Sequence, residues 1–302
     1  MGFAALDAAQ GEAAGLLEDL HRTLAATPAP RRARGWLGKM RARVGRPVEP
    51  VRGLYLWGGV GRGKTYLMDW FADGPAPAGK RRVHFHHFMR DVHDGLSRLP
   101  RQPDPLEVLA EQLSRDTRVL CLDEFIVHDI ADAMILYGLL KGLFDRGVTL
   151  VTTSNTLPDD LYRNGLQRQR FVPAIDLLKR HTRVFELAGD TDYRLQRLSR
   201  AGCYFPTSQP DADASLAGYF ETIAGAHLEA ADAILIDDRE IAVRRLGKDV
   251  VWFDFAELCD KPRSTAIYLE IAQEYHTVLV SGVPVLSAAR DAAARRFLHL
   301  VD

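Results

Sequence analysis

The sequence predicts an α/β protein in which a parallel sheet with helices on both faces is followed by a smaller C-terminal region of mixed α/β structure. In residues 51–200, short and almost wholly apolar strand-like segments alternate with helical segments. This alternation is typical of a parallel sheet that is buried on both faces. Beyond about residue 200, three strand-like segments follow one another with only turns between them, which indicates antiparallel pairing.

Composition and charge limit the class of protein. The chain has 302 residues, of which 47% are hydrophobic and 26% charged, an ordinary globular mixture long enough for about two domains. The 39 Lys and Arg residues nearly balance the 40 Asp and Glu residues. The resulting net charge of -1 predicts no global attraction to nucleic acid or to membranes, so nucleic acid is an unlikely partner.

Targeting and redox signals favour a cytoplasmic protein without a transmembrane segment. The three cysteines are far apart and form no CxxC pair, which argues against a zinc ribbon and a disulfide framework. The N-terminus lacks the basic region of a signal peptide. The longest uncharged stretch is too short to span a bilayer and contains Pro284.

Residues 1–50 are expected to form an N-terminal helix and a basic segment. Leucines at helical spacing predict a helix over 7–26, which the TPAP sequence ends. The basic segment, residues 31–46, holds seven basic residues and no acid. It is either a solvated linker or a contact for an acidic protein tail, anionic lipid or nucleic acid, and among these partners we favour the acidic tail.

Residues 51–200 and 201–302 are expected to form two separate regions, the core and the smaller C-terminal region. In the core, strands are predicted at 53–57, 82–88, 118–125, 148–155 and 182–187. Helices are predicted at 64–72, from 89 to about 99, at 106–115, 130–145 and 173–180. In the C-terminal region, strands are predicted at 233–236, 240–246, 249–255 and 277–283, helices at 264–275 and 286–300, and a turn at Gly247.

A glycine-rich loop lies between the first core strand and the first core helix. It reads G-x-x-x-x-G-K-T and consists of Gly58, Gly59, Val60, Gly61, Arg62, Gly63, Lys64 and Thr65. The glycines let backbone N–H groups converge on an anion, and the helix that follows presents its N-terminus to the same anion. In such a loop Lys64 reaches the β- and γ-phosphates and the Thr65 hydroxyl binds Mg²⁺. The loop therefore predicts a nucleotide-binding site.

Two acids end the strand predicted at 118–125. Asp123 and Glu124 follow four apolar or small residues and emerge at the C-terminal edge of that strand, where ligands bind in open α/β sheets. We expect Asp123 to hold Mg²⁺ through water. We expect Glu124 to polarise the attacking water as the general base of hydrolysis.

The strand predicted at 148–155 ends in polar residues. We expect Asn155 to hold the attacking water against the γ-phosphate, and the alternative for this residue is a helix N-cap. The sequence contains no N-K-x-D motif of the kind that reads guanine, which favours ATP over GTP.

Arg163, Arg168 and Arg170 precede the last core strand and are candidates for an arginine finger. Such a side chain projects from one subunit onto the γ-phosphate held by its neighbour, which requires a homo-oligomer formed with ATP. We prefer Arg168, then Arg170. The alternative is an exposed helix with ordinary solvated arginines.

These segments resemble one family, the ZapE-type AAA+ ATPases, which have mitochondrial relatives. The resemblance runs from about residue 50 to the end and rests on GLYLWGGVGRGKTYLMDWF, RVHFHHFMRDVH, LCLDEFIVHDIADAMIL, VTLVTTSNTLPDDLYRNGLQRQRFVPAI and VWFDFAELCDKPRSTAIYLEIA. It implies an AAA+ ATPase that uses ATP and Mg²⁺. The bacterial member is a cytoplasmic cell-division factor that acts on FtsZ polymers and is recruited late to the constriction site, whereas the mitochondrial relatives are linked to protein quality control. The resemblance thus implies a cell-division role with FtsZ as partner.

One departure from the family pattern concerns the C-terminal end. Family members usually continue past RRFLHLVD through a strand and a helix that carries F-x-R-x-x-S-R-L-x-E-M, whose arginine is the expected second sensor of the nucleotide. This chain stops at Asp302. We therefore expect a C-terminal region that is truncated relative to the family and lacks that arginine.

Two alternatives stand beside an ATP-hydrolysing remodeller. One is an ATP-controlled nucleic-acid-binding loader module, against which the near-neutral charge argues. The other is an ATP-gated adaptor without turnover, which the missing tail favours.

Overall fold

The computed structural model describes residues 6–28, 49–74, 79–189, 205, 211–224, 228–236, 239–247, 250–287 and 290–301. The chain divides into two compact units, Met1–Arg197 and Leu198–Asp302. The basic segment lies outside the described residues, so what we expect of it stays a prediction. None of the helices in the described ranges combines the length and the apolarity that a membrane span requires.

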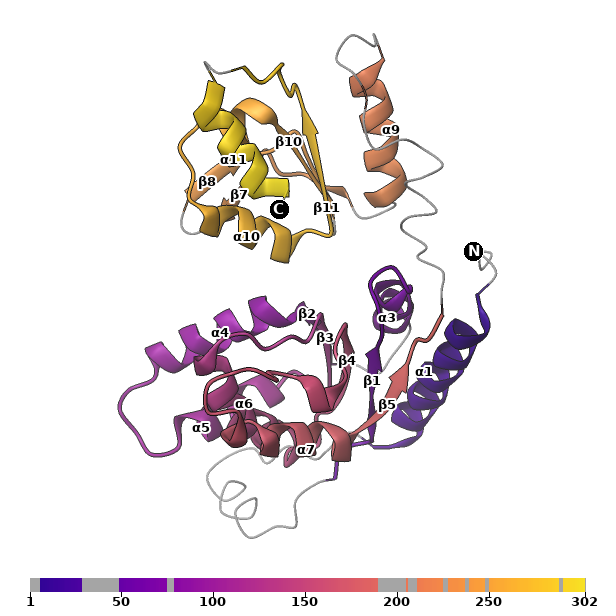
Figure 1. The fold of residues 1–302 in the computed structure, drawn as a ribbon. Helices are drawn as coiled ribbons and strands as arrows, with labels where there is room; N and C mark the ends of the chain where they lie inside the picture. Colours follow the sequence, from indigo (N-terminus) through magenta and orange to yellow (C-terminus); the bar gives the residue numbers. More distant parts are fainter. Residues whose placement is uncertain are drawn as a thin grey trace. The chain divides into compact units, whose positions relative to one another are not determined.

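The first unit is built on a five-stranded parallel sheet in the order β2-β3-β4-β1-β5 (Figure 1). The strands are β1 (Gly53–Trp57), β2 (Lys80–His84), β3 (Val119–Asp123), β4 (Thr149–Ser154) and β5 (Thr182–Glu186). Every residue of β3 and β4 is buried. A central strand that is buried on both faces does not alternate apolar with polar residues, which explains the apolar runs of the sequence.

Helices cover both faces of this sheet, and alternate residues of one strand reach different cores (Figure 1). Leu54 and Leu56 pack on the face covered by α1 (Ala8–Ala26) and α3 (Lys64–Asp73). Tyr55 lies between them and packs on the opposite face. That face is covered by α4 (Phe85–Arg98), α5 (Pro105–Ser114), α6 (Ile130–Phe144) and α7 (Val172–His181). The two-residue period of a strand produces this division.

The strand order places β4 between β1 and β3. All the strands run in the same direction, so their carboxyl ends meet at one edge of the sheet. The glycine-rich loop follows β1, the two acids end β3, and Asn155 follows β4. The fold therefore brings the three predicted parts of the site to neighbouring positions.

The strand predicted at 82–88 is wrong beyond His84, where α4 begins. The residues that follow place Phe85, Phe88, Met89 and Val92 at the i, i+3, i+4 and i+7 positions of a helix, and all four are buried. Helical periodicity therefore outweighs the strand-like look of HFHHF. The LPDDLYRN sequence between β4 and α7 contains a short 3-10 turn, η1 (Pro158–Asp160).

The second unit has a four-stranded sheet in the order β11-β10-β9-β6 and a separate two-stranded sheet, β7-β8 (Figure 1). The strands are β6 (Leu228–Glu229), β7 (Ala233–Ile236), β8 (Arg239–Ala242), β9 (Arg245–Gly247), β10 (Val250–Asp254) and β11 (Thr277–Ser281). The helices are α9 (Ala212–Ala224), a π-helical turn η3 (Ala256–Asp260), α10 (Thr265–Glu274) and α11 (Asp291–Val301). Apolar residues of these strands and helices form a core of their own.

Two predictions for the second unit are corrected. The strand expected at 240–246 is two strands, β8 and β9, that belong to different sheets. Arg244 lies in the sequence between these two strands. Its guanidinium lies over the Trp252 ring and pairs with Asp213 and Asp254, which fixes the chain where it passes from one sheet to the other. Gly247 ends β9 and pairs with Val250 instead of occupying a turn.

The fold class is confirmed: a P-loop parallel sheet with helices on both faces and a smaller mixed α/β region.

The close approach of β1 and β4 at Gly53 makes a test of this packing. A Cβ atom at Gly53 would lie 1.7 Å from the carbonyl oxygen of Leu150, a backbone atom that cannot move aside without breaking strand pairing. We expect Gly53→Ala to lower the free energy of unfolding by more than about 2 kcal/mol in urea denaturation.

The matched control is Gly11→Ala on α1, where an added Cβ meets nothing within 4 Å. Because alanine favours a helix, this variant is expected to gain about 0.5–1 kcal/mol. Equal unfolding midpoints for the two variants would contradict the packing described for β1 and β4.

Candidate functional site

The glycine-rich loop joins the carboxyl end of β1 to the start of α3. Gly61 and Gly63 have φ angles of 78° and 83°, in the left-handed region that side chains with a Cβ rarely adopt. Gly63 is also the N-cap of α3, so the helix begins directly at Lys64. The loop therefore turns its chain onto a helix N-terminus, which is the arrangement that binds phosphate through backbone N–H groups.

Lys64 is held inside this loop. Its Nζ donates to the carbonyl oxygens of Gly58 at 2.7 Å and Gly59 at 2.6 Å, and only 9% of the residue is exposed. A buried ammonium needs such partners, because its charge has lost the water around it. The lysine charge is thus kept at the loop, ready for an anion.

Gln10 of α1 makes a hydrogen bond to the glycine-rich loop. It is 7% exposed, and its Nε2 donates to the carbonyl oxygen of Arg62 at 3.1 Å. Its own helix start is fixed by a capping box in which Asp7 and Gln10 bond each other's backbone N–H groups. A Cβ at Gly63 would be strained by the φ of 83° and would lie 2.7 Å from the Gln10 Nε2, so a larger residue there would also displace the Gln10 amide.

Hydrogen bonds on the two sides of β4 hold the end of β3 and the start of the glycine-rich loop. The Thr152 hydroxyl donates to the carbonyl oxygen of Leu122 at 2.8 Å, and the Ser154 hydroxyl donates to that of Phe125 at 2.7 Å. On the other side of β4, the Gly58 N–H donates to the Ser154 carbonyl at 3.2 Å. β4 therefore holds the end of β3 and the start of the glycine-rich loop at the same level.

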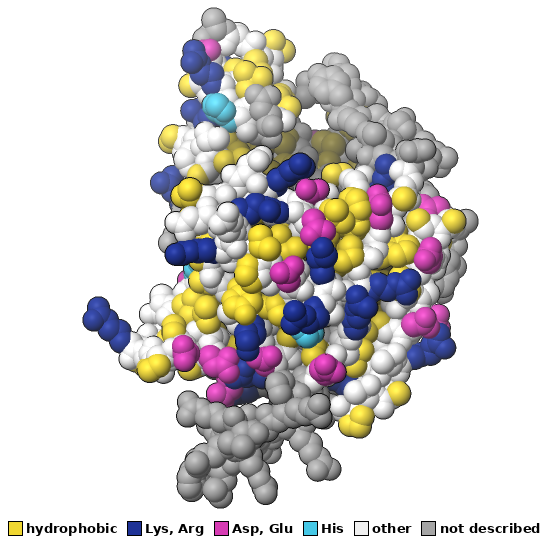
Figure 2. Space-filling model, turned by 60° about the horizontal axis from the view of Figure 1, so that its bottom comes forward, with side chains coloured by type: hydrophobic (Ala, Val, Ile, Leu, Met, Phe, Trp, Pro, Cys, Tyr) yellow, Lys and Arg dark blue, Asp and Glu magenta, His cyan; other side chains and the backbone are white. Residues whose placement is uncertain are grey.

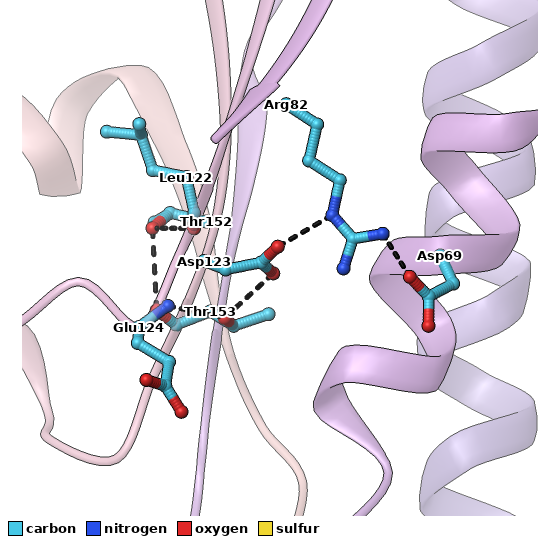
Figure 3. Close-up of polar contacts among 7 residues, drawn as sticks. All are labelled: Asp69, Arg82, Leu122, Asp123, Glu124, Thr152 and Thr153. Carbon is cyan, nitrogen blue, oxygen red and sulfur yellow. Dashed lines mark hydrogen bonds and ion pairs between the residues drawn. The ribbon is translucent and has the colours of Figure 1, made fainter. Parts of the chain in front are cut away.

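Glu124 has a strained backbone. Its φ is 56°, which is uncommon for a residue with a side chain, and its N–H donates to the Thr153 hydroxyl at 3.0 Å. Strain of this kind persists only where the surrounding structure imposes it, and it is concentrated at functional sites. Figure 3 shows the Glu124 side chain directed away from that of Asp123. The two acids therefore face different surroundings.

Asp123 lies in a buried ionic bridge (Figure 3). Its Oδ2 accepts from Arg82 Nε at 2.6 Å, and Arg82 Nη1 pairs with Asp69 on α3. Burial by itself lowers the pKa of Arg82, but the charges and hydrogen bonds of Asp123 and Asp69 outweigh it and raise the pKa above its ordinary value. Arg82 therefore stays charged between two acids.

Asn155 follows Ser154 and is exposed at the same edge of the sheet. The N-cap alternative for Asn155 is wrong, since the next helical turn, η1, has Leu157 at its N-cap.

The three candidate arginines lie beyond η1, in and before a second 3-10 turn, η2 (Arg168–Arg170). Arg168 is half-buried and its Nη2 donates to the Asp159 carbonyl, Arg170 is exposed, and Arg163 lies 3.4 Å from Asp160. Arg163 also lines a pocket of about 350 Å³ between the loops that follow β3 and β4. The structure thus places these three arginines on the segment between η1 and α7.

Three histidines cluster where β2 passes into α4. His84 pairs in register with Asp123, and the rings of His86 and His87 lie 4.1 Å apart between centroids. Burial, with the neighbouring His87, His84 and Arg90 charges, lowers the pKa of His86 to about 4. His86 is therefore neutral at physiological pH.

Comparison with known proteins now decides the family. The family model described as AFG1-like ATPase matches residues 2–302 of the chain. The chain belongs to the AFG1-like ATPase family. The ZapE-type resemblance of the sequence is thereby confirmed.

Relatives span bacteria and eukaryotes. The chain is 42% identical to the cell division protein ZapE of Escherichia coli K12 over 98% of this chain and 80% of that protein. It is 39% identical to lactation elevated protein 1 homolog B of Danio rerio over 84% of this chain and 53% of that protein. Among solved structures, domain III of DnaA from Thermotoga maritima is similar with a TM-score of 0.42 and 15% identity, covering 74% of this chain and 88% of that chain.

Sequence reasoning missed three residues of this AFG1-like site: Gln10, Asp69 and Arg82. The sequence carries a signal for two of them, Asp69 and Arg82. Asp69 is four residues after Thr65 and so shares its face of α3, and Arg82 is a charge inside a strand beside the acidic strand, where it needs a partner. Gln10 left no signal, since its role comes from the packing of α1 on the loop.

Proposed function

We propose that this AFG1-like ATPase hydrolyses ATP with Mg²⁺ at the edge of its parallel sheet and uses the energy to remodel a cell-division polymer, FtsZ. The observation that carries the proposal is the position of β4, whose hydroxyl groups bond the end of β3 and whose Ser154 carbonyl accepts from the Gly58 N–H at the start of the glycine-rich loop. An ATPase needs these two parts together, because one holds the phosphates and the other activates water.

The loop residues 58–65 and the acid Asp123 fit a nucleotide with its metal. Lys64 carries a buried positive charge at the loop, and α3 begins at that residue, so the N–H groups of the first helical turn lie at the end of the loop. The Thr65 hydroxyl and the Asp123 carboxylate are hard oxygen ligands of the kind that Mg²⁺ prefers. When bound, Mg²⁺ neutralises charge that develops on the phosphate oxygens.

Water activation is assigned to Glu124 and Asn155. Glu124 lies at the carboxyl edge, next to the residue that ends β3, with its backbone fixed by the Thr153 hydroxyl. Its carboxylate takes a proton from the attacking water. Asn155, exposed at the tip of β4, orients that water with its amide from between the loop and the acids.

Two substitutions separate binding from hydrolysis. Lys64→Ala removes the charge that the phosphates meet, so ATP affinity is expected to fall by about tenfold or more in a calorimetric titration. Glu124→Gln keeps the size of the side chain but not its basicity, so kcat is expected to fall by at least about 100-fold while ATP still binds.

The control for the second variant is Glu18→Gln, the same change at an exposed position of α1. It is expected to leave kcat and ATP affinity unchanged. Wild-type turnover by Glu124→Gln would show that another group takes the proton.

We also propose that Arg168, or failing it Arg170, completes the site of a neighbouring subunit in an ATP-dependent homo-oligomer. Both lie on one loop with η2, and Arg170 is exposed there. A guanidinium that meets the γ-phosphate stabilises the charge of the transition state. Arg168 would have to leave the Asp159 carbonyl, to which it donates in this structure.

A mixing experiment tests this arrangement. Arg168→Ala and Glu124→Gln chains are each expected to be nearly inactive, and a mixture is expected to recover part of the turnover, because an intact Glu124 of one subunit meets an intact Arg168 of the other. Arg163→Ala, in the same loop, serves as the control and should keep its turnover. Turnover that is independent of protein concentration, with no recovery on mixing, would count against the shared site.

The partner proposal draws on the relatives. The E. coli relative carries the name cell division protein, and the family resemblance implies FtsZ polymers and recruitment to the division site of the cytoplasm. With ATP and Mg²⁺ the chain is expected to change the sedimentation of FtsZ polymers, and with ADP it is not, because a motor redistributes polymer states only if its two nucleotide forms bind them differently. Equal effects with ATP, with ADP and without nucleotide would contradict the proposal.

Charge on the surface does not favour the nucleic-acid alternative. On the face shown in Figure 2, Lys and Arg side chains are interspersed with Asp and Glu, and no broad area of one sign is visible among the coloured side chains. A nucleic-acid footprint on this face would be a continuous basic area.

A further inference from the structure

The ionic bridge at Asp123 joins the two elements that carry the proposed metal ligands. Thr65 and Asp69 lie four residues apart and so share a face of α3, and Asp123 ends β3. Arg82 comes from β2 and pairs with both carboxylates (Figure 3). Its side chain is 13% exposed and that of Asp123 is 4% exposed. The bridge is therefore placed where the metal is proposed to bind.

Asp123 needs a cation in this position. Its Oδ2 accepts from Arg82 at 2.6 Å, whereas its Oδ1 has a long contact of 3.5 Å with the Thr153 hydroxyl. A buried carboxylate without a positive partner is costly. Arg82 thus supplies to Asp123 the positive charge that a metal ion would otherwise bring.

The guanidinium of Arg82 is only partly satisfied. Nε bonds Asp123 and Nη1 bonds Asp69, but Nη2 is buried and has no hydrogen-bond partner. Figure 3 shows Nη2 between the two carboxylates. Because arginine and carboxylate form favourable two-bond pairs, the guanidinium can turn wholly onto Asp69 with one nitrogen already in place.

We propose that Arg82 is a positioning residue that holds Asp123 while no metal is bound and moves its Asp123 contact onto Asp69 when Mg²⁺ binds with the nucleotide. The proposal rests on the proposed nucleotide site. A dication and a guanidinium repel each other at one carboxylate, so Arg82 lowers the affinity of the metal. Asp69 raises that affinity, because it gives Arg82 another partner.

The two residues therefore have opposite effects on metal binding. Arg82→Gln removes the competing charge, and the affinity for Mn²⁺ as a probe of the Mg²⁺ site is expected to rise about tenfold. Asp69→Asn removes the negative charge that competes with Asp123 for Arg82, and the Mn²⁺ affinity is expected to fall about tenfold. The control is Arg81→Gln, the neighbouring residue of β2, whose guanidinium pairs with Asp91 at the surface and which should not change the affinity.

The measurement uses the full chain with saturating ADP, and free Mn²⁺ is counted from its electron paramagnetic resonance signal. A second readout is the melting temperature, where Arg82→Gln should be less stable than the wild type without metal and should gain more from added Mg²⁺. A purely structural bridge would instead weaken Mn²⁺ binding in both variants. That result, or unchanged affinity in both, would overturn the proposal.

Failure of the underlying site gives a different result. If the wild-type chain with ADP binds no Mn²⁺, the proposed nucleotide–metal site is wrong and the role of Arg82 falls with it. If the wild type binds Mn²⁺ but the signs of the two changes are not opposite, only the role of Arg82 is wrong. Should Arg82→Gln fail to fold, Asp69→Asn alone tests the proposal. Tighter or unchanged Mn²⁺ binding in that variant would contradict the movement of Arg82 from Asp123 to Asp69.

Discussion

The pairing of β4 with both β1 and β3 is the constraint on which the site depends. Parallel pairing brings the carboxyl ends of the three strands to one edge, and the side chains of Thr152, Thr153 and Ser154 then bond the backbone that leaves β3. Because these hydroxyl groups are buried, each finds its partner within the protein. The glycine-rich loop and the acids are in this way fixed relative to each other, so a ligand that contacts both would meet less of the entropic cost of ordering them.

The buried charged side chains at this edge of the sheet are paired with groups of the protein itself. Lys64 donates to loop carbonyls, and Asp123 and Asp69 share the guanidinium of Arg82. Buried charges of this kind are costly to leave single, so under the proposed function the binding of a nucleotide with its metal would require an exchange of partners. Such an exchange links the loop, α3 and β2 in one event. A remodelling ATPase needs a link of this type if its nucleotide state is to reach the rest of the chain.

The sequence predicted the parts of the site that a local pattern encodes. The loop at 58–65 and the acids at 123 and 124 follow strands whose apolar runs mark them as buried, so their place at one edge follows from the fold class. Arg82 and Gln10 were missed because their partners come from elements distant in the chain. The strand predicted through HFHHF was wrong because so short a segment fits either period, and the burial of Phe85, Phe88, Met89 and Val92 at helical spacing shows a helix.

The most direct measurement of the central claim is phosphate release from ATP by the purified full chain, with Mg²⁺ and again with Mg²⁺ removed by a chelator. If the edge formed by β1, β4 and β3 is an ATPase site, phosphate is released steadily with Mg²⁺ and release stops with the chelator, because the charge that develops on the phosphates is then uncompensated. ATP that stays intact in the presence of Mg²⁺, or release that continues unchanged without it, would contradict the account.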